Sequence, residues 1–441
     1  MVIDLNLAAR QDEPLTAISV AGFKSIAREQ TLHFAPLTIL AGANSSGKSS
    51  MMQPLLLMKQ TIEAPYDPGV FLLDGPNVRF TNSNQILSND SALGDGVFCT
   101  SFSTDSGSVF LCYKENNAYS FDVYRVTIKT LSGELTFGPE YIDRESIANF
   151  LRKELQMGED AFQSNEIGVY VFVDRCMSYI DLSPFSKKSP GSVFLPLRWF
   201  DLEDVVTDII HLPGLRGNPE RAYKTSGVGT KFSGTFENYV ASIINYWQQQ
   251  HPDNLHSLCR HLEHIGLTSK VSATALDATQ VEIKVGRLPG ATDADLVNIA
   301  DVGVGVSQTL PVLVALLAAE PGQIVYIEQP EIHLHPLAQY KLAAVIAEAS
   351  KRGVLVVIET HSDILIRGVQ TLVAKGELDP NIVKLHWFSR SPEDGSTTVT
   401  CAELDENGSF GDWPQDFDTT TLLTEKAYLD AVEERLFRNA K

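Results

Sequence analysis

Long hydrophobic runs are absent from this sequence. No stretch approaches the roughly 18–20 consecutive apolar residues that a membrane-spanning helix needs. The first residues, Met-Val-Ile-Asp-Leu-Asn, lack the basic start and apolar stretch of a secretion signal. Long heptad arrays, internal repeats and low-complexity tracts are also missing, which excludes a long coiled-coil arm. These absences predict a cytoplasmic protein that does not contact membranes.

Cysteines are few and scattered. The chain has five, with no CxxC pair and no cluster of histidines near them. This pattern indicates neither a zinc site nor a disulfide framework. We therefore expect packing roles for all five, namely Cys99, Cys112, Cys176, Cys259 and Cys401.

Positive charge is also in short supply. The chain has 35 Lys and Arg against 55 Asp and Glu, which gives a net charge of −20. Affinity for nucleic-acid backbones comes largely from Lys and Arg, so this balance disfavours a protein wrapped uniformly in nucleic acid. A local basic groove stays open as an alternative.

What the chain does have is enough apolar material for a large core. Its 441 residues are 44% apolar and 20% charged, as in ordinary soluble globular proteins. At about 150 residues per domain, this length predicts two or three folding units.

A complete phosphate-binding motif stands near the start of the chain. Residues 42–49 read GANSSGKS, after an apolar strand pattern at 37–41 and before a helix pattern at 50–60. Glycines let backbone N–H groups approach phosphate oxygens, Lys48 can reach the β- and γ-phosphates, and the Ser49 hydroxyl is a ligand for Mg²⁺. We expect ATP to be bound by Asn44, Ser45, Ser46, Gly47, Lys48, Ser49 and Ser50.

A second strand pattern, at residues 323–327, ends in acidic residues. Glu328 stands where a Walker B carboxylate holds magnesium beside the P-loop. The next position, where a hydrolytic glutamate would activate water, is Gln329, and an amide cannot act as a general base, although it can orient water. Glu331 is the nearest carboxylate that could substitute. The alternative is that these acids merely end a strand.

Histidines follow both acidic and apolar segments. His361 lies at the tip of a strand pattern at 354–358, where it can hydrogen-bond a γ-phosphate or the attacking water. A surface role is the alternative. His333 and His335 form only a weak zinc pattern without a third ligand, so we favour a loop-shaping or dimer-contact role for them.

A Gly-rich segment at residues 301–310 leads into an apolar helix pattern. Ser307 stands where a helix N-cap is expected, and a helix N-terminus can bind an anion. Since the P-loop already serves nucleotide in cis, this second anion site predicts a signature loop that acts in trans on another protomer. An ordinary capped helix is the alternative.

The segments group into an α/β fold of the P-loop NTPase type, because strand and helix patterns alternate after residue 300. The middle of the chain carries no triphosphate motif and is predicted to include an inserted lobe. The expected division is 1–14 a flexible arm, 15–89 the first part of the ATPase lobe, 90–285 an inserted mixed lobe, 286–400 the second part of the ATPase lobe, and 401–441 a tail.

Taken together, these motifs resemble the ABC-type ATPases of the SMC/RecF group, and most closely the overcoming-lysogenization-defect (OLD)-like branch. The similar blocks are residues 20–26 before the P-loop, 301–308 as the signature loop, 328–336 as an extended Walker B and 359–362 as the H-loop. Residues 211–221 resemble a basic turn of standalone members, and 407–414 resemble their C-terminal tail. Residues 90–200 have no clear counterpart.

The resemblance implies a mixed-sheet ABC head that dimerises head to head, with ATP between the P-loop of one protomer and Ser307 of the other. No Toprim nuclease follows the ATPase, so an effector nuclease or toxin is expected on a separate chain, as in Septu- and PARIS-type anti-phage defence. Arg216 and Arg221 could contact phosphate, with solvated surface arginines as the alternative, and Gln85 is the candidate for the glutamine loop.

Three functions compete at this point. The first is a slowly hydrolysing, nucleotide-gated switch for a separate effector in phage defence. The second is a RecF-like DNA-repair or DNA-binding ATPase. The third takes Gln329 at face value, as part of an assembly protein that binds ATP without hydrolysing it. Net charge and the missing coiled coil favour the first.

Overall fold

The structure is a computed structural model. It describes residues 13–116, 118, 120–139, 141–154, 167–184, 202–287, 290–411, 426–427 and 429–432. Nearly all of the predicted arm, and most of the tail beyond residue 411, lie outside the described residues.

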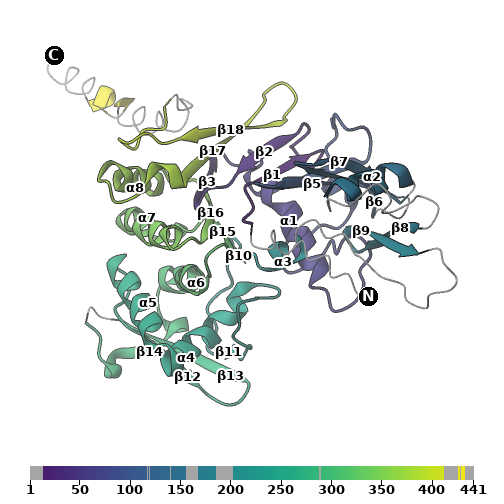
Figure 1. Cartoon of the computed structure of the whole chain (residues 1–441). Coiled ribbons are helices and arrows are strands. Elements are labelled where there is room, and N and C mark those ends of the chain that lie inside the picture. Colours follow the sequence, from purple (N-terminus) through teal and green to yellow (C-terminus); the bar gives the residue numbers. More distant parts are fainter. Residues whose placement is uncertain are drawn as a thin grey trace.

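A six-stranded sheet forms the centre of the molecule (Figure 1). Its first five strands are parallel, and only the last pairs antiparallel. The strand order is β10 (Ile210–Leu212), β15 (Ile324–Glu328), β16 (Leu355–Thr360), β3 (Leu37–Gly42), β17 (Val383–Arg390) and β18 (Thr397–Glu403). Parallel neighbours bring their carboxyl ends to one edge, so motifs far apart in sequence meet there.

Both faces of this sheet are buried, because successive residues of a strand point to opposite sides. In β15, Val325 and Ile327 join one hydrophobic core while Ile324 and Tyr326 join the other. The first core packs against α6 (Val304–Ala318), α7 (Pro336–Lys351) and α8 (Asp363–Ala374), and the second against α1 (Lys48–Ile62). Figure 1 shows these helices on opposite sides of the sheet.

A second, antiparallel sheet covers α1 on the far side from the central sheet. Its order is β2 (Gln30–His33), β1 (Ala17–Ala21), β4 (Val97–Thr104), β5 (Gly107–Glu115), β6 (Phe121–Thr130) and β7 (Gly133–Phe137). Because β1 pairs with β4, the sheet runs across the boundary predicted at residues 89 and 90. A hairpin of β8 (Ile167–Asp174) and β9 (Met177–Pro184), with α2 (Arg144–Glu154) and α3 (Leu202–Thr207), follows in the chain.

A third, smaller sheet lies beyond α6. It contains β11 (Tyr223–Lys224), β13 (Gln280–Gly286), β12 (Val271–Ala275) and β14 (Leu296–Asn298), beside α4 (Val240–Gln250) and α5 (Pro252–His264). This sheet crosses the boundary predicted at residues 285 and 286, since β14 pairs with β13. Short 3₁₀ turns complete the described elements: η1 (Ser83–Gln85), η2 (Phe236–Tyr239), η3 (Asp293–Asp295), η4 (Ile299–Asp301) and η5 (Pro380–Ile382).

The predicted α/β class and P-loop NTPase head are confirmed by this topology. Among the described residues, no helix is long and apolar enough to cross a membrane. The expectation for two of the cysteines is wrong: Cys99 and Cys112 stand opposite each other on β4 and β5 and form a disulfide. Sequence spacing gave no sign of it, because cross-strand pairing brings together residues 13 positions apart.

Candidate functional site

The P-loop joins β3 to α1 and needs its two glycines for different reasons. Gly42 has φ of 143°, and a Cβ there would lie 2.2 Å from the carbonyl oxygen of Phe388 on the neighbouring strand β17. Gly47 has φ of 103°, and a Cβ there would lie 2.4 Å from Oγ1 of Thr397. Both positions combine a left-handed backbone with a close approach, so side chains are excluded.

Thr397 anchors this loop from the far end of the chain. Its hydroxyl lies 2.8 Å from the carbonyl oxygen of Ser46 and 2.8 Å from Oγ of Ser25. Its backbone N–H donates to the Ser25 carbonyl at 2.7 Å. The loop is thereby held between the 22–26 turn and the first residue of β18, a contact that sequence motifs do not reveal.

Lys48 lies in the loop as the motif predicts. Its ammonium donates to the carbonyl oxygens of Gly42 and Ala43 at 3.1 and 2.9 Å. Burial lowers the pKa of Lys48, and the nearby Glu359 and Glu331 carboxylates partly oppose that change. Asn44 and Ser45 are exposed, Ser46 is buried, and Gly47, Ser49 and Ser50 are half-buried at the start of α1.

Two carboxylates meet at the tips of neighbouring strands beside the P-loop. Glu328 ends β15 and stands in register with Glu359 on β16. The Ser49 hydroxyl donates to Oε1 of Glu359 at 3.0 Å, and Tyr326 donates to its other oxygen at 3.0 Å. Glu359 is therefore the acid that contacts the P-loop serine, and sequence reasoning gave it no role.

Glu328, predicted to hold magnesium, contacts both β10 and the turn that follows it. Its carboxylate lies 3.2 Å from Nε2 of His211 and accepts from the N–H of Gly214 at 3.1 Å. Burial by itself would raise the pKa of Glu328, but the hydrogen bonds from His211 and Gly214 outweigh burial and lower it. The side chain is thus held as a carboxylate next to Glu359.

Gln329 adopts a left-handed backbone with φ of 46°, which is uncommon for a residue with a side chain. Its N–H donates to the carbonyl oxygen of Glu359 at 2.7 Å and fixes the turn after the Walker B strand. The amide therefore sits in a constrained position directly after Glu328. Strain of this kind concentrates at functional sites.

Glu331, the predicted substitute base, lies 8% exposed beneath the histidine segment. Its Oε1 accepts from the Thr360 hydroxyl at 2.8 Å and from the His361 N–H at 3.0 Å. Its Oε2 is buried without a hydrogen-bond partner among the described residues. Burial raises the pKa of Glu331, although these hydrogen bonds oppose the rise. The residue shapes the His361 turn and leaves one oxygen for a further group.

His361 follows β16 directly and lies close enough to Lys48 for their charges to interact. Burial and the Lys48 cation lower its pKa, while a hydrogen bond with Gly42 opposes them. The neutral ring is therefore favoured at pH 7. The structure brings His361, Lys48 and Glu331 together as the order of motifs predicts.

Ser307 lies elsewhere than predicted within its helix. α6 begins at Val304 with Gly303 as its N-cap, so Ser307 is one turn inside. Its hydroxyl donates to the Val304 carbonyl at 3.0 Å. The N-cap expectation was wrong because the Gly-Val-Gly-Val stretch is itself helical from Val304. The exposed start of α6 is Val304, at 49% exposure.

The two arginines of the 211–221 turn have different environments. Arg216 is 8% exposed and donates to the carbonyl oxygens of Glu328 at 2.9 Å and Gln308 at 3.4 Å, so the alternative of a solvated surface arginine is wrong for it. Arg221 forms an exposed ion pair with Asp301 at 2.6 Å.

The remaining predicted residues shape local turns. His335 is the N-cap of α7 and accepts from the Leu337 N–H at 3.3 Å, and His333 has φ of 64° in the turn before it. Both fit the loop-shaping role. Gln85 is exposed and accepts from the Thr81 N–H at 2.8 Å.

The oxygen-rich strand tips suit Mg²⁺, which prefers carboxylate, hydroxyl and phosphate oxygens. Ser49, Glu328 and Glu359 supply such donors, and the partnerless Oε2 of Glu331 adds another buried oxygen. Within the described residues, no cluster of three or more His, Cys, Asp or Glu side chains forms a metal site by itself. The nucleotide would have to complete the coordination, with the metal neutralising phosphate charge.

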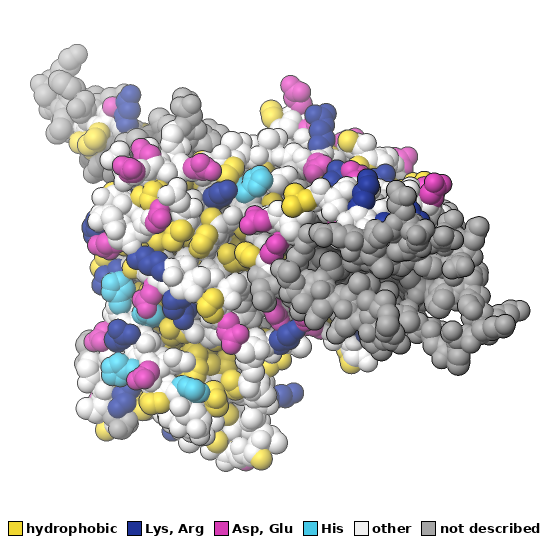
Figure 2. Space-filling model, in the orientation of Figure 1, with side chains coloured by type: hydrophobic (Ala, Val, Ile, Leu, Met, Phe, Trp, Pro, Cys, Tyr) yellow, Lys and Arg dark blue, Asp and Glu magenta, His cyan; other side chains and the backbone are white. Residues whose placement is uncertain are grey.

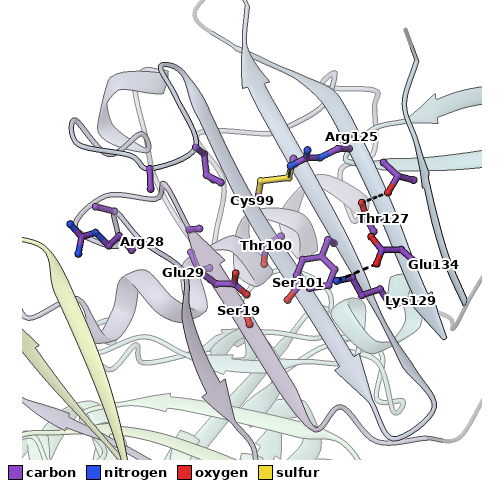
Figure 3. A pocket seen from close by; sticks show the side chains of 18 residues that line it. Ser19, Arg28, Glu29, Cys99, Thr100, Ser101, Arg125, Thr127, Lys129 and Glu134 are labelled. Atoms are coloured by element: carbon purple, nitrogen blue, oxygen red, sulfur yellow. Dashed lines mark hydrogen bonds and ion pairs between the residues drawn. A yellow bond between two sulfur atoms is a disulfide. The ribbon is translucent and has the colours of Figure 1, made fainter. Parts of the chain in front are cut away.

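A separate hollow of about 440 Å³ opens on the outer face of the antiparallel sheet (Figure 3). Its polar side chains largely pair with one another: Lys129 with Glu134 at 3.5 Å, and Thr127 with Thr136 at 3.0 Å. On the described part of the face in Figure 2, Lys and Arg are interspersed with Asp and Glu and do not form a continuous stripe.

The loop between β3 and α1, with acidic and histidine strand tips beside it, defines a P-loop nucleotide-binding site. Residues 198–367 match the family described as "AAA domain, putative AbiEii toxin, Type IV TA system". That segment contains Ser307, Glu328 and His361 and begins after the P-loop. No curated protein matches the sequence. Residues 198–367 are therefore similar to an AAA domain, and the P-loop that precedes them is a motif of nucleotide-binding ATPases.

Solved structures of SMC heads are similar to this chain. An SMC head bound to the C-winged helix domain of ScpA is 13% identical with a TM-score of 0.45, over 89% of this chain and 98% of that one. The SMC head domain from Thermotoga maritima is 12% identical with a TM-score of 0.35, over 89% and 100%. A third head, with an extended coiled coil and bound to the C-terminal domain of ScpA derived from Pyrococcus furiosus, is 12% identical with a TM-score of 0.41, over 88% and 96%.

Proposed function

We propose that the protein is a nucleotide-gated switch that binds ATP and Mg²⁺ between two copies of itself and hydrolyses ATP slowly. The observation that carries this proposal is Gln329, an amide held in a strained turn beside Glu328 where a general base is expected. An amide orients water without removing its proton, so the bound state is long-lived.

Glu331 does not readily replace the missing base. One of its oxygens is occupied by Thr360 and His361, and burial raises its pKa. A carboxyl that shapes a turn in this way supports the position of His361 more than proton abstraction. Slow turnover is therefore expected even with all motifs present.

The second copy of the protein contributes the N-terminus of its α6 to the nucleotide site. Each protomer offers one P-loop, and the exposed N-terminus of α6 at Val304 offers N–H groups that suit the phosphates of nucleotide held by a partner. The resemblance to ABC-type heads supports this head-to-head arrangement. Closure of the dimer would then depend on bound ATP.

The proposed biological role is control of a separate effector, a nuclease or toxin, in bacterial anti-phage defence. It rests on the OLD-like resemblance and agrees with the toxin–antitoxin wording of the matched family description. The net charge of −20 and the mixed surface charges favour a protein partner over bare nucleic acid.

Steady-state phosphate release tests the proposal. We expect slow turnover in the wild type, none in Lys48→Ala, and an increase of about a hundredfold in Gln329→Glu, because a positioned base typically contributes that much. Glu331→Ala tests whether Glu331 acts as a base or only shapes the turn. Unchanged turnover in this variant supports the turn-shaping role. Fast wild-type turnover that Gln329→Glu does not raise would overturn the proposal.

A further inference from the structure

The disulfide between Cys99 and Cys112 lies outside the two large hydrophobic cores. Phe98 and Phe102 of β4 join the core that packs against α1, whereas the two cysteines form a small separate cluster with Val97. Successive residues of a strand point to opposite faces, so the cross-link lies on the outer face of the antiparallel sheet. It therefore does not join parts of either large core.

Both cysteines line the hollow of about 440 Å³ on that face. Figure 3 shows the disulfide there, with the side chain of Arg125 reaching towards it from β6. Nη2 of Arg125 donates to Sγ of Cys112 at 3.8 Å. The cross-link thus borders a space that a small molecule can enter, and it has a cation beside one of its sulfurs.

The position of Arg125 makes the two sulfurs chemically different. A guanidinium next to a sulfur stabilises the thiolate form of that sulfur. In thiol–disulfide exchange, the bond breaks faster when the leaving sulfur is stabilised as a thiolate. Cys112 is therefore the favoured leaving sulfur, and Cys99 is the sulfur that is attacked.

The strand pairing holds the two cysteines opposite each other whether or not the bond exists. They are a register pair of β4 and β5, with Cα atoms 4.1 Å apart, and the pairs before and after them are also in register. Directly opposite residues of antiparallel strands lie about this close by backbone geometry alone. After reduction the two thiols stay within reach of each other, so the bond can form again.

We propose that Cys99–Cys112 is a reversible redox site, opened by a small-molecule thiol that enters the hollow. The thiolate of the small molecule attacks Sγ of Cys99 and forms a new S–S bond to it. The Cys99–Cys112 bond breaks, and its electron pair stays on Sγ of Cys112 as a thiolate beside Arg125. A second thiolate attacks the sulfur of the bound small molecule, which leaves as a disulfide and frees Cys99 as a thiolate. Two small thiols are thereby oxidised to one disulfide, the protein pair keeps their two protons, and a small-molecule disulfide reverses the reaction.

A contiguous series of contacts leads from this site to the P-loop. Cys99 pairs with Ala21 at the end of β1, and the turn that follows carries Ser25. The Thr397 N–H donates to the Ser25 carbonyl at 2.7 Å, and its hydroxyl lies 2.8 Å from the Ser46 carbonyl oxygen. Without the covalent link to β5, β4 supports this turn less firmly. We therefore expect the reduced protein to hold nucleotide less tightly, and this part rests on the proposed function.

Residue-specific alkylation tests the redox site. The full chain is oxidised with glutathione disulfide, treated in native buffer with reduced glutathione, and then denatured and alkylated before peptide mass spectrometry. We expect Cys99 and Cys112 to be cross-linked and unlabelled after oxidation, labelled after reduced glutathione, and cross-linked again after renewed oxidation. Labelling after the first oxidation would show that no disulfide forms. Reduction that requires denaturant would show a structural cross-link, and either result would overturn the proposal.

Arg125→Gln tests the assignment of the leaving sulfur. We expect reduction by 2-mercaptoethanol, a thiol without other charges, to become about fivefold slower, because a unit charge about 4 Å away is worth that much even in water. Lys129→Gln removes a cation from the same strand and hollow, but Lys129 is paired with Glu134, so the rate should stay unchanged. Thermal melts show that both variants keep the fold. Equal rates in the two variants would contradict the assigned role of Arg125.

Binding of a fluorescent ATP analogue to the oxidised and the reduced protein measures the coupling. We expect about fivefold weaker binding after reduction, which is within the usual range for coupled sites. Cys99→Ser/Cys112→Ser cannot form the bond, so its affinity should match that of the reduced wild type and should not respond to glutathione. Equal affinity of the oxidised and reduced wild type would refute the coupling. Absence of nucleotide binding in both forms would instead refute the proposed function, and the alkylation result would stand.

Discussion

Two acids side by side dominate the energetics of the site at the scale of single residues. Glu328 and Glu359 are in register on adjacent strands, and both are mostly buried. Hydrogen bonds lower the pKa of Glu328, so Glu328 is the carboxylate of the pair that carries the negative charge. Burial first, and then the Glu328 charge, raise the pKa of Glu359, although Ser49, Lys48 and Tyr326 oppose the rise. Without a bound cation the Glu328 and Glu359 carboxylates therefore repel each other, and a cation bound beside them would reduce that repulsion.

Glu359→Gln should stabilise the nucleotide-free protein at neutral pH. When the pKa of a carboxyl is higher in the folded than in the unfolded protein, the free energy of unfolding falls as pH rises from the unfolded pKa through the folded one. The wild type undergoes this loss, whereas the variant has no carboxyl at this position and does not. We expect a gain in unfolding free energy on the order of 1 kcal/mol at about pH 8 that shrinks towards pH 5.

Urea unfolding without nucleotide or Mg²⁺ measures that difference. Glu377→Gln, at an exposed position, serves as the control and should show no pH-dependent gain. A constant difference between the two pH values would contradict the explanation by charge. Weaker Mg²⁺-dependent nucleotide binding in Glu359→Gln is the expected functional counterpart.

The sequence predicts those site residues whose role follows from a motif. It does not reveal those whose role follows from the pairing of neighbouring strands. Lys48 and His361 lie close together, and Glu328 stands in register with Glu359, because each lies at the end of a parallel strand or at the start of the helix after one. Glu359 was visible in the same segment as His361, but only the register with Glu328 gives it a role. Arg216 appeared as a surface cation because burial of a charge is not visible in composition.

At the scale of elements, α7 and α8 pack unusually close. A Cβ at Gly368 of α8 would lie 2.7 Å from the Cβ of Ala343 and 2.8 Å from the Tyr340 carbonyl oxygen, both on α7. The glycine in the middle of a helix is therefore required by its neighbour. α7 packs against β16, so this pair of helices supports the strand that carries Glu359 and leads to His361.

Gly368→Ala should destabilise the protein by about 1–3 kcal/mol, since overpacking outweighs the helix propensity that normally favours alanine by about 1 kcal/mol. Chemical denaturation measures the change. Gly305→Ala in α6 is the matched control, because the nearest atom to its Cβ would be 3.4 Å away, and we expect it to be neutral or stabilising. Equal effects at the two positions would refute the packing argument.

Most elements around the site were predictable because their patterns are local. The helix expected at residues 50–60 lies within α1, and the strand expected at 323–327 is β15. Sheet partners were not predictable, since pairing depends on contacts between distant segments. For that reason the sequence placed a boundary between β1 and β4, which are neighbours in one sheet.

At the scale of the whole molecule, the proposed composite site predicts that two defective variants complement each other in mixed dimers. Lys48→Ala should inactivate the P-loop, and Val304→Arg should block the exposed start of α6 with a bulky cation. Mixed at equal amounts, they form heterodimers with one intact P-loop facing one intact α6. Phosphate release is then expected to recover to about a quarter of the wild-type value, since half the dimers carry one working site of two.

Each variant alone must be inactive for this measurement, and Val304→Ser, a small change at the same position, should retain activity. Light scattering with ATP reports whether dimers form. Mixtures as inactive as their components, despite dimer formation, would show that nucleotide is handled within one protomer.

Thr397 makes the anchoring of the P-loop depend on a residue that is synthesised much later than the loop. The ribosome makes the loop long before it reaches Thr397, because the threonine that holds the Ser46 carbonyl lies 351 residues further on. A ribosome adds residues at roughly 5–20 per second, so the P-loop exists for many seconds before the anchoring threonine is synthesised. The loop is thus held in place only after residue 397 has been made, when the strands of the antiparallel sheet and most residues of both hydrophobic cores have already been synthesised.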